Sequence, residues 1–161
     1  MKIRLLKLGT IVKDTPTGVK GMLTIASMDM DKNINYIFQP CSLNPTTGQP
    51  SDRIQVVENR IKGGEYEEID LPFQILGSIV EDKATNFRGT AVCLDYHISG
   101  CVHFDVKPAG LIKKTGCTID AYNFDIRRLV GAEIPKLTEE KLEESKKSTP
   151  SPEKEFQKSK M

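Results

Sequence analysis

The sequence has no tryptophan, only two histidines and no long apolar run. Without a run of about 18 to 20 apolar residues, a membrane-spanning helix is excluded. The first residues, MKIRLLKLGTIVKD, lack the long apolar segment and small-residue cleavage site of a secretory signal. We therefore expect a soluble protein in a reducing cytoplasm, with its four cysteines as free thiols.

Sequence patterns for catalysis are also missing. The chain contains no HExxH motif, no G-x-S-x-G motif, no phosphate-binding loop and no CxxC pair. Its 23 basic and 22 acidic residues give a net charge of +1, which predicts weak overall attraction to nucleic acid. We expect a protein that binds rather than catalyses, and that needs no cofactor.

What the sequence does contain is an internal repeat. When the chain is shifted by 68 positions, residues 8–65 align without a gap on residues 76–133, and 15 of the 58 aligned residues are identical. This agreement predicts a tandem duplication. In the first copy the identical residues are Leu8, Gly9, Ile11, Val12, Asp14, Thr17, Gly21, Pro40, Leu43, Thr47, Gly48, Asp52, Arg60, Gly63 and Glu65.

Apolar residues occupy every second position in parts of both copies, as at Ile34, Tyr36 and Phe38. This period predicts half-buried strands, separated by turns or close packing at the shared glycines. Short strands of this kind suit a small closed or half-closed barrel, so the expected fold class is all-β with two tandem SH3-like barrels. The expected strands of the first copy cover about 8–13, 21–27 and 34–38, with a strand or helical turn over 54–61.

Three segments follow from the repeat: a first SH3-like unit over 1–66, a second over 67–134, and a tail over 135–161. Each unit alone would bury little apolar surface, and the linker Gly63–Glu68 is short, so we expect the two units to pack together. The tail alternates Lys and Glu blocks with Ser-Pro pairs and predicts disorder, or a docking peptide around Leu142 or Phe156.

One stretch of the second copy resembles a pattern of small tailed-bacteriophage proteins. In that pattern Leu-Gly-x-x-Val-x-Asp-x-x-Thr-x-Phe-x-Gly precedes Gly-Cys and an alternating strand that ends in Pro. The first copy departs from it at Val19 and at Lys32-Asn33. The residues that carry the resemblance are Leu76, Gly77, Val80, Asp82, Thr85, Phe87, Gly89, Gly100, Cys101 and Pro108.

The resemblance implies an SH3-like fold and a phage context, either in the host cytoplasm or in the virion. Within that context the main hypothesis is a non-enzymatic accessory protein that binds a host or phage protein, with self-association. A virion component of head, neck or tail is the first alternative. The second alternative is a protein that sequesters a nucleotide-like or other anionic small molecule between the two units.

Two polar positions recur in both copies. Asp14 and Asp82, each followed by a threonine three residues later, are typical of an Asx turn, in which the carboxylate accepts local hydrogen bonds. Arg60 and Arg128 are retained among divergent neighbours and predict either an internal salt bridge or an anion contact. Both arginines are candidate binding residues, together with Tyr96 and His103.

The cysteines and histidines of the second copy form one further constellation. Cys93, His97, Cys101 and Cys117 are weak zinc candidates, because their spacing matches no zinc module and the first copy lacks them. Buried structural cysteines are the alternative. Short basic clusters such as Lys113-Lys114 leave nucleic acid as a further partner, against the alternative of a solvated mixed-charge surface.

Overall fold

The structure is a computed structural model that describes residues 1–72 and 74–131. It confirms an all-β protein: the helical elements in these ranges are two three-residue 3-10 turns, η1 (Glu58–Arg60) and η2 (Ile126–Arg128). No helix in the described ranges is long and apolar enough to cross a membrane. The tail expected over 135–161 lies outside the described residues.

Each half of the chain folds into a lobe of five antiparallel strands. The strand order is β6-β2-β3-β4-β5 in the first lobe and β12-β8-β9-β10-β11 in the second. The first lobe comprises β2 (Ile11–Asp14), β3 (Lys20–Asp29), β4 (Ile34–Pro40), β5 (Ile54–Val57) and β6 (Ile61–Lys62). The second comprises β8 (Ile79–Asp82), β9 (Arg88–His97), β10 (Val102–Lys107), β11 (Tyr122–Asp125) and β12 (Leu129–Val130).

Neither lobe closes into a barrel within the described residues. No pairing joins β5 to β6, or β11 to β12, so the two end strands of each lobe remain apart. The strands lie close to the positions that the sequence predicts. Their pairing, however, forms open sheets rather than closed barrels. Where the sequence predicts a strand or a helical turn at the end of each unit, the structure has both: a short strand followed by a 3-10 turn.

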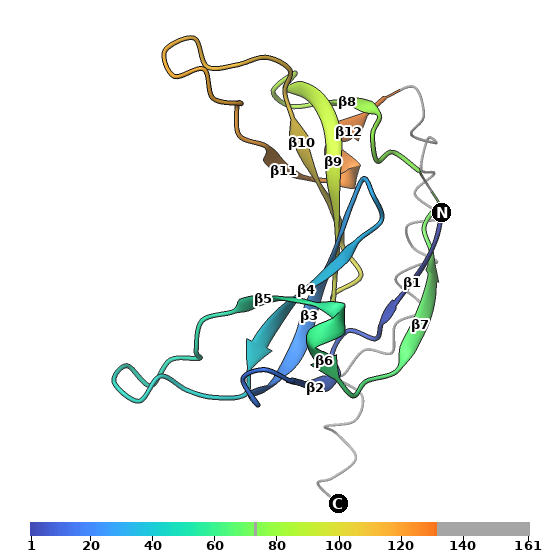
Figure 1. Cartoon of the computed structure of the whole chain (residues 1–161). Coiled ribbons are helices and arrows are strands. Elements are labelled where there is room, and N and C mark those ends of the chain that lie inside the picture. The colour runs from blue at the N-terminus through green and yellow to red at the C-terminus, as the bar shows by residue number, and fades with distance from the viewer. Residues whose placement is uncertain (73, 132–161) are drawn as a thin grey trace, which may run out of the picture.

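The two lobes share one continuous sheet, because β3 pairs antiparallel with β9. Ser27 lies opposite Asp95, the residue 68 positions later, and on either side Ile25 lies opposite His97 and Asp29 opposite Cys93. Residues separated by the repeat interval therefore exchange places across a local two-fold axis between Ser27 and Asp95. The resulting ten-stranded sheet runs through the middle of the molecule, with one lobe at each end (Figure 1).

A separate two-stranded ribbon, β1 (Lys2–Leu6) and β7 (Tyr66–Asp70), packs beside the sheet. Figure 1 shows it on the opposite side of the central strands from the two long loops. Tyr36 fixes the ribbon to the first lobe, because its fully buried hydroxyl accepts a 2.8 Å hydrogen bond from the Leu6 backbone N–H. The ribbon is an element that the repeat did not predict.

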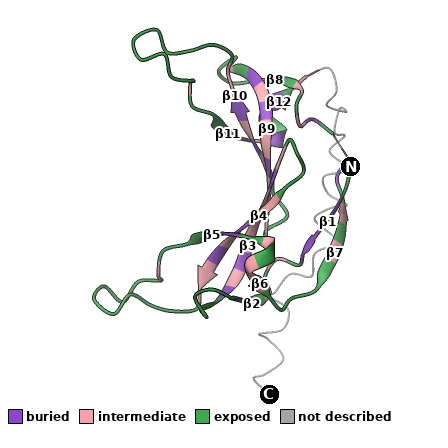
Figure 2. Ribbon diagram, in the orientation of Figure 1, coloured by how far each residue is buried: buried purple, intermediate pink, exposed green. Residues whose placement is uncertain are grey.

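The core lies on one face of the sheet, as the alternation of buried and less buried positions along β3, β4, β9 and β10 in Figure 2 shows. Tyr36, Phe38, Phe104 and other apolar residues of both lobes form one buried cluster with the ribbon residues Ile3 and Leu5. The expected packing of the two halves against each other is thus present as a shared core and a shared sheet.

Two of the glycines shared by the lobes lie inside strands. Gly21 and Gly89 lie inside β3 and β9, where an added Cβ would come within 2.5 Å of the Gln39 carbonyl oxygen or 2.4 Å of the Lys107 carbonyl oxygen. These two positions require close packing rather than a turn.

Candidate binding surfaces

A buried aspartate is held in the same way in each lobe. In the first lobe Asp14 is fully buried at the end of β2. The Arg60 guanidinium donates from Nε to Oδ1 at 2.9 Å and from Nη2 to Oδ2 at 2.8 Å, and the Thr17 hydroxyl also donates to Oδ2. The hydrogen bonds from Arg60, followed by that from Thr17, hold the pKa of Asp14 below its usual range.

The second lobe repeats this arrangement at an interval of 68 residues. Arg128 donates from Nε and Nη2 to the two oxygens of Asp82, both at 2.8 Å. Thr85 donates its backbone N–H at 3.0 Å and its hydroxyl at 2.6 Å to Oδ2. The Arg128 and Thr85 hydrogen bonds lower the pKa of Asp82 to about 2, although burial opposes the shift.

These contacts confirm the predicted turn, in which the aspartate accepts a hydrogen bond from the threonine three residues later. Of the two alternatives for the arginines, the structure shows the internal salt bridge. Each pair connects the end of one strand to the 3-10 turn at the end of the lobe. The side chains of Arg60 and Arg128 remain 38% and 49% exposed. A binding role for the two arginines stays a prediction.

The surface opposite the core is polar in the second lobe. We call it the polar face; it comprises Asp95 and His97 on β9, His103 and Asp105 on β10, and Asn123 and Asp125 on β11. The register of the strands brings these residues together, because His103 lies opposite both Asp95 and Asp125, and Asp105 lies opposite Asn123.

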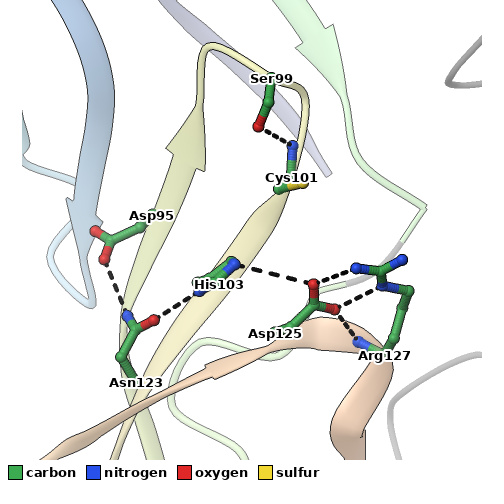
Figure 3. Close-up of polar contacts among 7 residues, drawn as sticks. All are labelled: Asp95, Ser99, Cys101, His103, Asn123, Asp125 and Arg127. Atoms are coloured by element: carbon green, nitrogen blue, oxygen red, sulfur yellow. Dashed lines mark hydrogen bonds and ion pairs between the residues drawn. The ribbon is translucent and has the colours of Figure 1, made fainter.

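Asn123 is the centre of the hydrogen-bond network on the polar face (Figure 3). Its Nδ2 donates to Asp105 Oδ1 at 2.8 Å and to Asp95 Oδ2 at 3.2 Å. Since both donors of the amide point at carboxylates, its Oδ1 accepts from His103 Nδ1 at 2.7 Å. The proton of a neutral His103 therefore sits on Nδ1, which leaves Nε2 turned toward Asp125 at 3.9 Å.

Carboxylates dominate the electrostatics of this face. The Arg127 guanidinium, 2.7 Å from Asp125, is the main cause of the lowered pKa of that carboxyl. Burial, followed by repulsion from Asp95, Asp105 and Asp29, raises the pKa of the Cys93 thiol to about 12. With its pKa raised to about 12, the Cys93 thiol offers no thiolate nucleophile at neutral pH. The acidic side chains of the face favour a cationic ligand.

At the matching positions of its strands β4 and β5, the first lobe carries no charge. Asn35, Ile37, Gln55 and Val57 stand where the second lobe has His103, Asp105, Asn123 and Asp125. The acidic residues of β10 and β11 thus have no counterparts in the first lobe, which contributes Asp29 of β3 opposite Cys93. A comparison of residues 68 positions apart could have found this surface, since these positions gain charge in the second copy alone.

The other residues singled out by the sequence lie apart from this network or at its margin. His97 stacks against His103, with ring centroids 4.8 Å apart, and burial lowers its pKa. Tyr96 is half-buried against the core. Cys101 and Cys117 are exposed, and within the described ranges no three His, Cys, Asp or Glu side chains are grouped to hold a metal ion.

Two long loops form a second candidate surface. We call residues 41–53 arm 1 and residues 108–121 arm 2; both project away from the body of the molecule (Figure 1). Each closes on itself through an isolated bridge, Leu43 to Pro50 in arm 1 and Leu111 to Thr118 in arm 2. Leu43 is 64% exposed and Leu111 is 58% exposed, so an exposed leucine stands at the same position of both arms.

Comparison with known protein families, with curated proteins and with solved structures gives no match for this chain.

Proposed function

We propose that this protein is a non-enzymatic binding protein of a bacteriophage, and that it contacts a host or phage protein through both arms. The observation that carries the proposal is the pair of exposed leucines, Leu43 and Leu111, at matching positions of two projecting loops. Exposed apolar side chains on well-defined loops gain more from burial in a partner than from water. The phage context depends on the resemblance of residues 76–108.

Internal hydrogen bonds order both arms. In arm 1 the Gly48 backbone N–H donates to the Asn44 carbonyl, and in arm 2 that of Gly116 donates to the Ile112 carbonyl, both at 2.8 Å. Each glycine adopts a positive φ, 71° in Gly48 and 67° in Gly116, which allows the tight return of the chain. A loop ordered in this way loses less conformational entropy on binding.

The polar face adds a preference for a basic partner. The charge of Arg53, at the end of arm 1, adds to the lowering of the pKa of His97, so this arm and the polar face are coupled electrostatically. A partner that contacts arm 1 and the polar face would meet the carboxylates of Asp95 and Asp105. Lysine or arginine on the partner would complement them.

We also propose that the two lobes are tandem copies of one SH3-like unit. In support, the Asp14–Arg60 and Asp82–Arg128 pairs have equal sequence separations, and both lobes have the same strand order. The 3-10 turn precedes the last short strand in each lobe.

Site-specific crosslinking tests the proposed function. A photoreactive benzoylphenylalanine is placed at Leu43 or at Leu111 in the full chain, and at Ile79 as a control that is 59% exposed outside the arms. In infected cells we expect the same partner protein to crosslink to both arm positions and not to position 79. Equal labelling at all three positions, or none at the arms, would contradict the proposal.

A virion component is the second candidate. The strands β5 and β11, each paired on one side only within the described residues, favour it, because open edges suit assembly into larger structures. Mass spectrometry of purified particles would then find the chain in a fixed ratio to the major capsid or tail proteins. An accessory protein of the infected cell would be absent from the particles.

A further inference from the structure

Among the described strands of the large sheet, four are paired on one side only: β5 and β11, and the two-residue strands β6 and β12. The longer two, β5 and β11, offer the longer edges. Within the described residues β5 pairs with β4 alone, and β11 pairs with β10 alone. Each of these two strands therefore presents a row of backbone N–H and C=O groups to its outer side. Such a row is a template for another strand, which gains main-chain hydrogen bonds by adding to it.

Three features with which proteins commonly block strand addition, a proline, a lysine and a β-bulge, are missing from these two four-residue strands. The sequences IQVV of β5 and YNFD of β11 contain no proline and no lysine, and neither pairing is interrupted by a bulge. Apolar side chains are exposed along both: Val57 is 44% exposed and Tyr122 is 58% exposed. A strand added at either edge would bury these apolar side chains, which favours association.

The central pairing of the molecule indicates what fits these edges. β3 of the first lobe and β9 of the second are matching strands, and they pair antiparallel around a two-fold axis. β5 and β11 are likewise matching strands of the two lobes, since Ile54–Val57 and Tyr122–Asp125 are 68 residues apart. They lie on different lobes and cannot meet within one molecule, because β3 and β9 already join the lobes.

We propose that β5 of one molecule pairs with β11 of a second copy, so that the sheet continues from molecule to molecule. The contact is heterologous, because each copy contributes a different edge, and the second edge of each copy stays available. Growth then continues into a ring or an open filament. This self-assembly goes beyond the proposed partner binding through the arms and does not depend on it.

Lysine substitutions at the edges test the proposal in the full-length protein. In analytical ultracentrifugation we expect the wild type to form dimers and larger species as its concentration rises. Val57→Lys and Tyr122→Lys should each be monomeric over the same range. An equimolar mixture of the two should form a dimer and nothing larger, because the intact β11 of the first variant meets the intact β5 of the second.

The control is Ile11→Lys with Ile79→Lys, at residues 48% and 59% exposed on strands with a neighbour on both sides, β2 and β8. This double variant should assemble as the wild type does. A wild type that stays monomeric at all concentrations overturns the proposal. So does a mixture of the two edge variants that stays monomeric, or either variant alone that still dimerises, since this would show β5–β5 or β11–β11 contacts.

Hydrogen exchange provides a measurement without substitutions. Amides of β5 and β11 should exchange more slowly as the concentration of wild-type protein rises, while those of β2 and β8 should not change. Unchanged exchange in β5 and β11 overturns the proposal even if one variant fails to fold. A failure of self-assembly would leave the crosslinks at Leu43 and Leu111 as a separate result, so the two proposals are distinguishable.

Discussion

Removal of one buried hydroxyl should destabilise the whole molecule. Tyr36 has no exposed surface, and its hydroxyl accepts the hydrogen bond of the buried Leu6 N–H at 2.8 Å. In Tyr36→Phe the ring still fills its space, but this N–H loses its partner. An unsatisfied buried donor costs about 1 to 3 kcal/mol, so we expect a loss of about 2 kcal/mol.

Urea denaturation measures this loss. With a slope of about 2 kcal/mol per molar urea, a loss of about 2 kcal/mol lowers the midpoint by about 1 M. Amide exchange should report the same event at one position, because the freed Leu6 N–H loses protection before its neighbours do.

Tyr66→Phe is the matched control. It removes a hydroxyl that donates to Glu58, the carboxylate that Tyr36 also approaches, but Tyr66 is 47% exposed and water replaces the lost contact. Its midpoint should stay within experimental error of the wild type. Equal effects of the two substitutions would refute the reasoning, since burial of the Leu6 N–H would then not decide the cost.

Three further predictions follow from the contacts described above. Because their folded-state pKa values are lowered, that of Asp82 to about 2, Asp14 and Asp82 stabilise the fold above the unfolded value near 3.8. This stabilisation should disappear as the pH falls from about 4 to 2, which denaturation at each pH would show, and Asp82→Asn should weaken the dependence. In thermal unfolding Gly89→Ala should lower stability by about 1 to 3 kcal/mol because its Cβ would meet the Lys107 backbone, whereas Gly116→Ala, with no neighbour within 4 Å, should lose stability only through the strain of its positive φ. In thiol labelling at pH 8, Cys93 should react last, because its pKa is about 12 and the other three cysteines are exposed.

The repeat predicted much of the fold. Alternating residues in each copy located the strands because a half-buried strand leaves a period of two in the sequence. The matching Arg positions also predicted an internal salt bridge, as one of two alternatives. The identity of its partner was not visible, because 46 residues separate Asp14 from Arg60 and only the folded chain brings them together.

The contacts between the lobes could not be predicted from the sequence. Strand β3 extends past the expected end at Ser27, and β9 past the corresponding position Asp95; of the five residue pairs between the two strands, all but Ser27–Asp95 include a residue of these extensions. Periodicity reports which face of a strand is buried but not which strand lies beside it. The β1–β7 ribbon was missed for a related reason, since Lys2–Leu6 lies outside the aligned residues of the repeat.

The polar face depends on both kinds of information. Its residues are ordinary polar positions of three separate strands in the sequence, and the strand register alone makes neighbours of His103, Asn123 and Asp125. Their absence from the first copy is a sequence signal, but it has no meaning until the positions are known to share one surface.

The hydrogen bond from Ser27 to Asp95 has a consequence for which mutations this protein can accept. In a dimer of identical chains, a residue on the two-fold axis faces a copy of itself, so an aspartate there would oppose an aspartate and repel it. Here both halves belong to one chain, and a mutation on one side of the axis leaves the other side unaltered. A donor can therefore face an acceptor at the centre of the sheet, and an asymmetric surface can develop on a symmetrical framework.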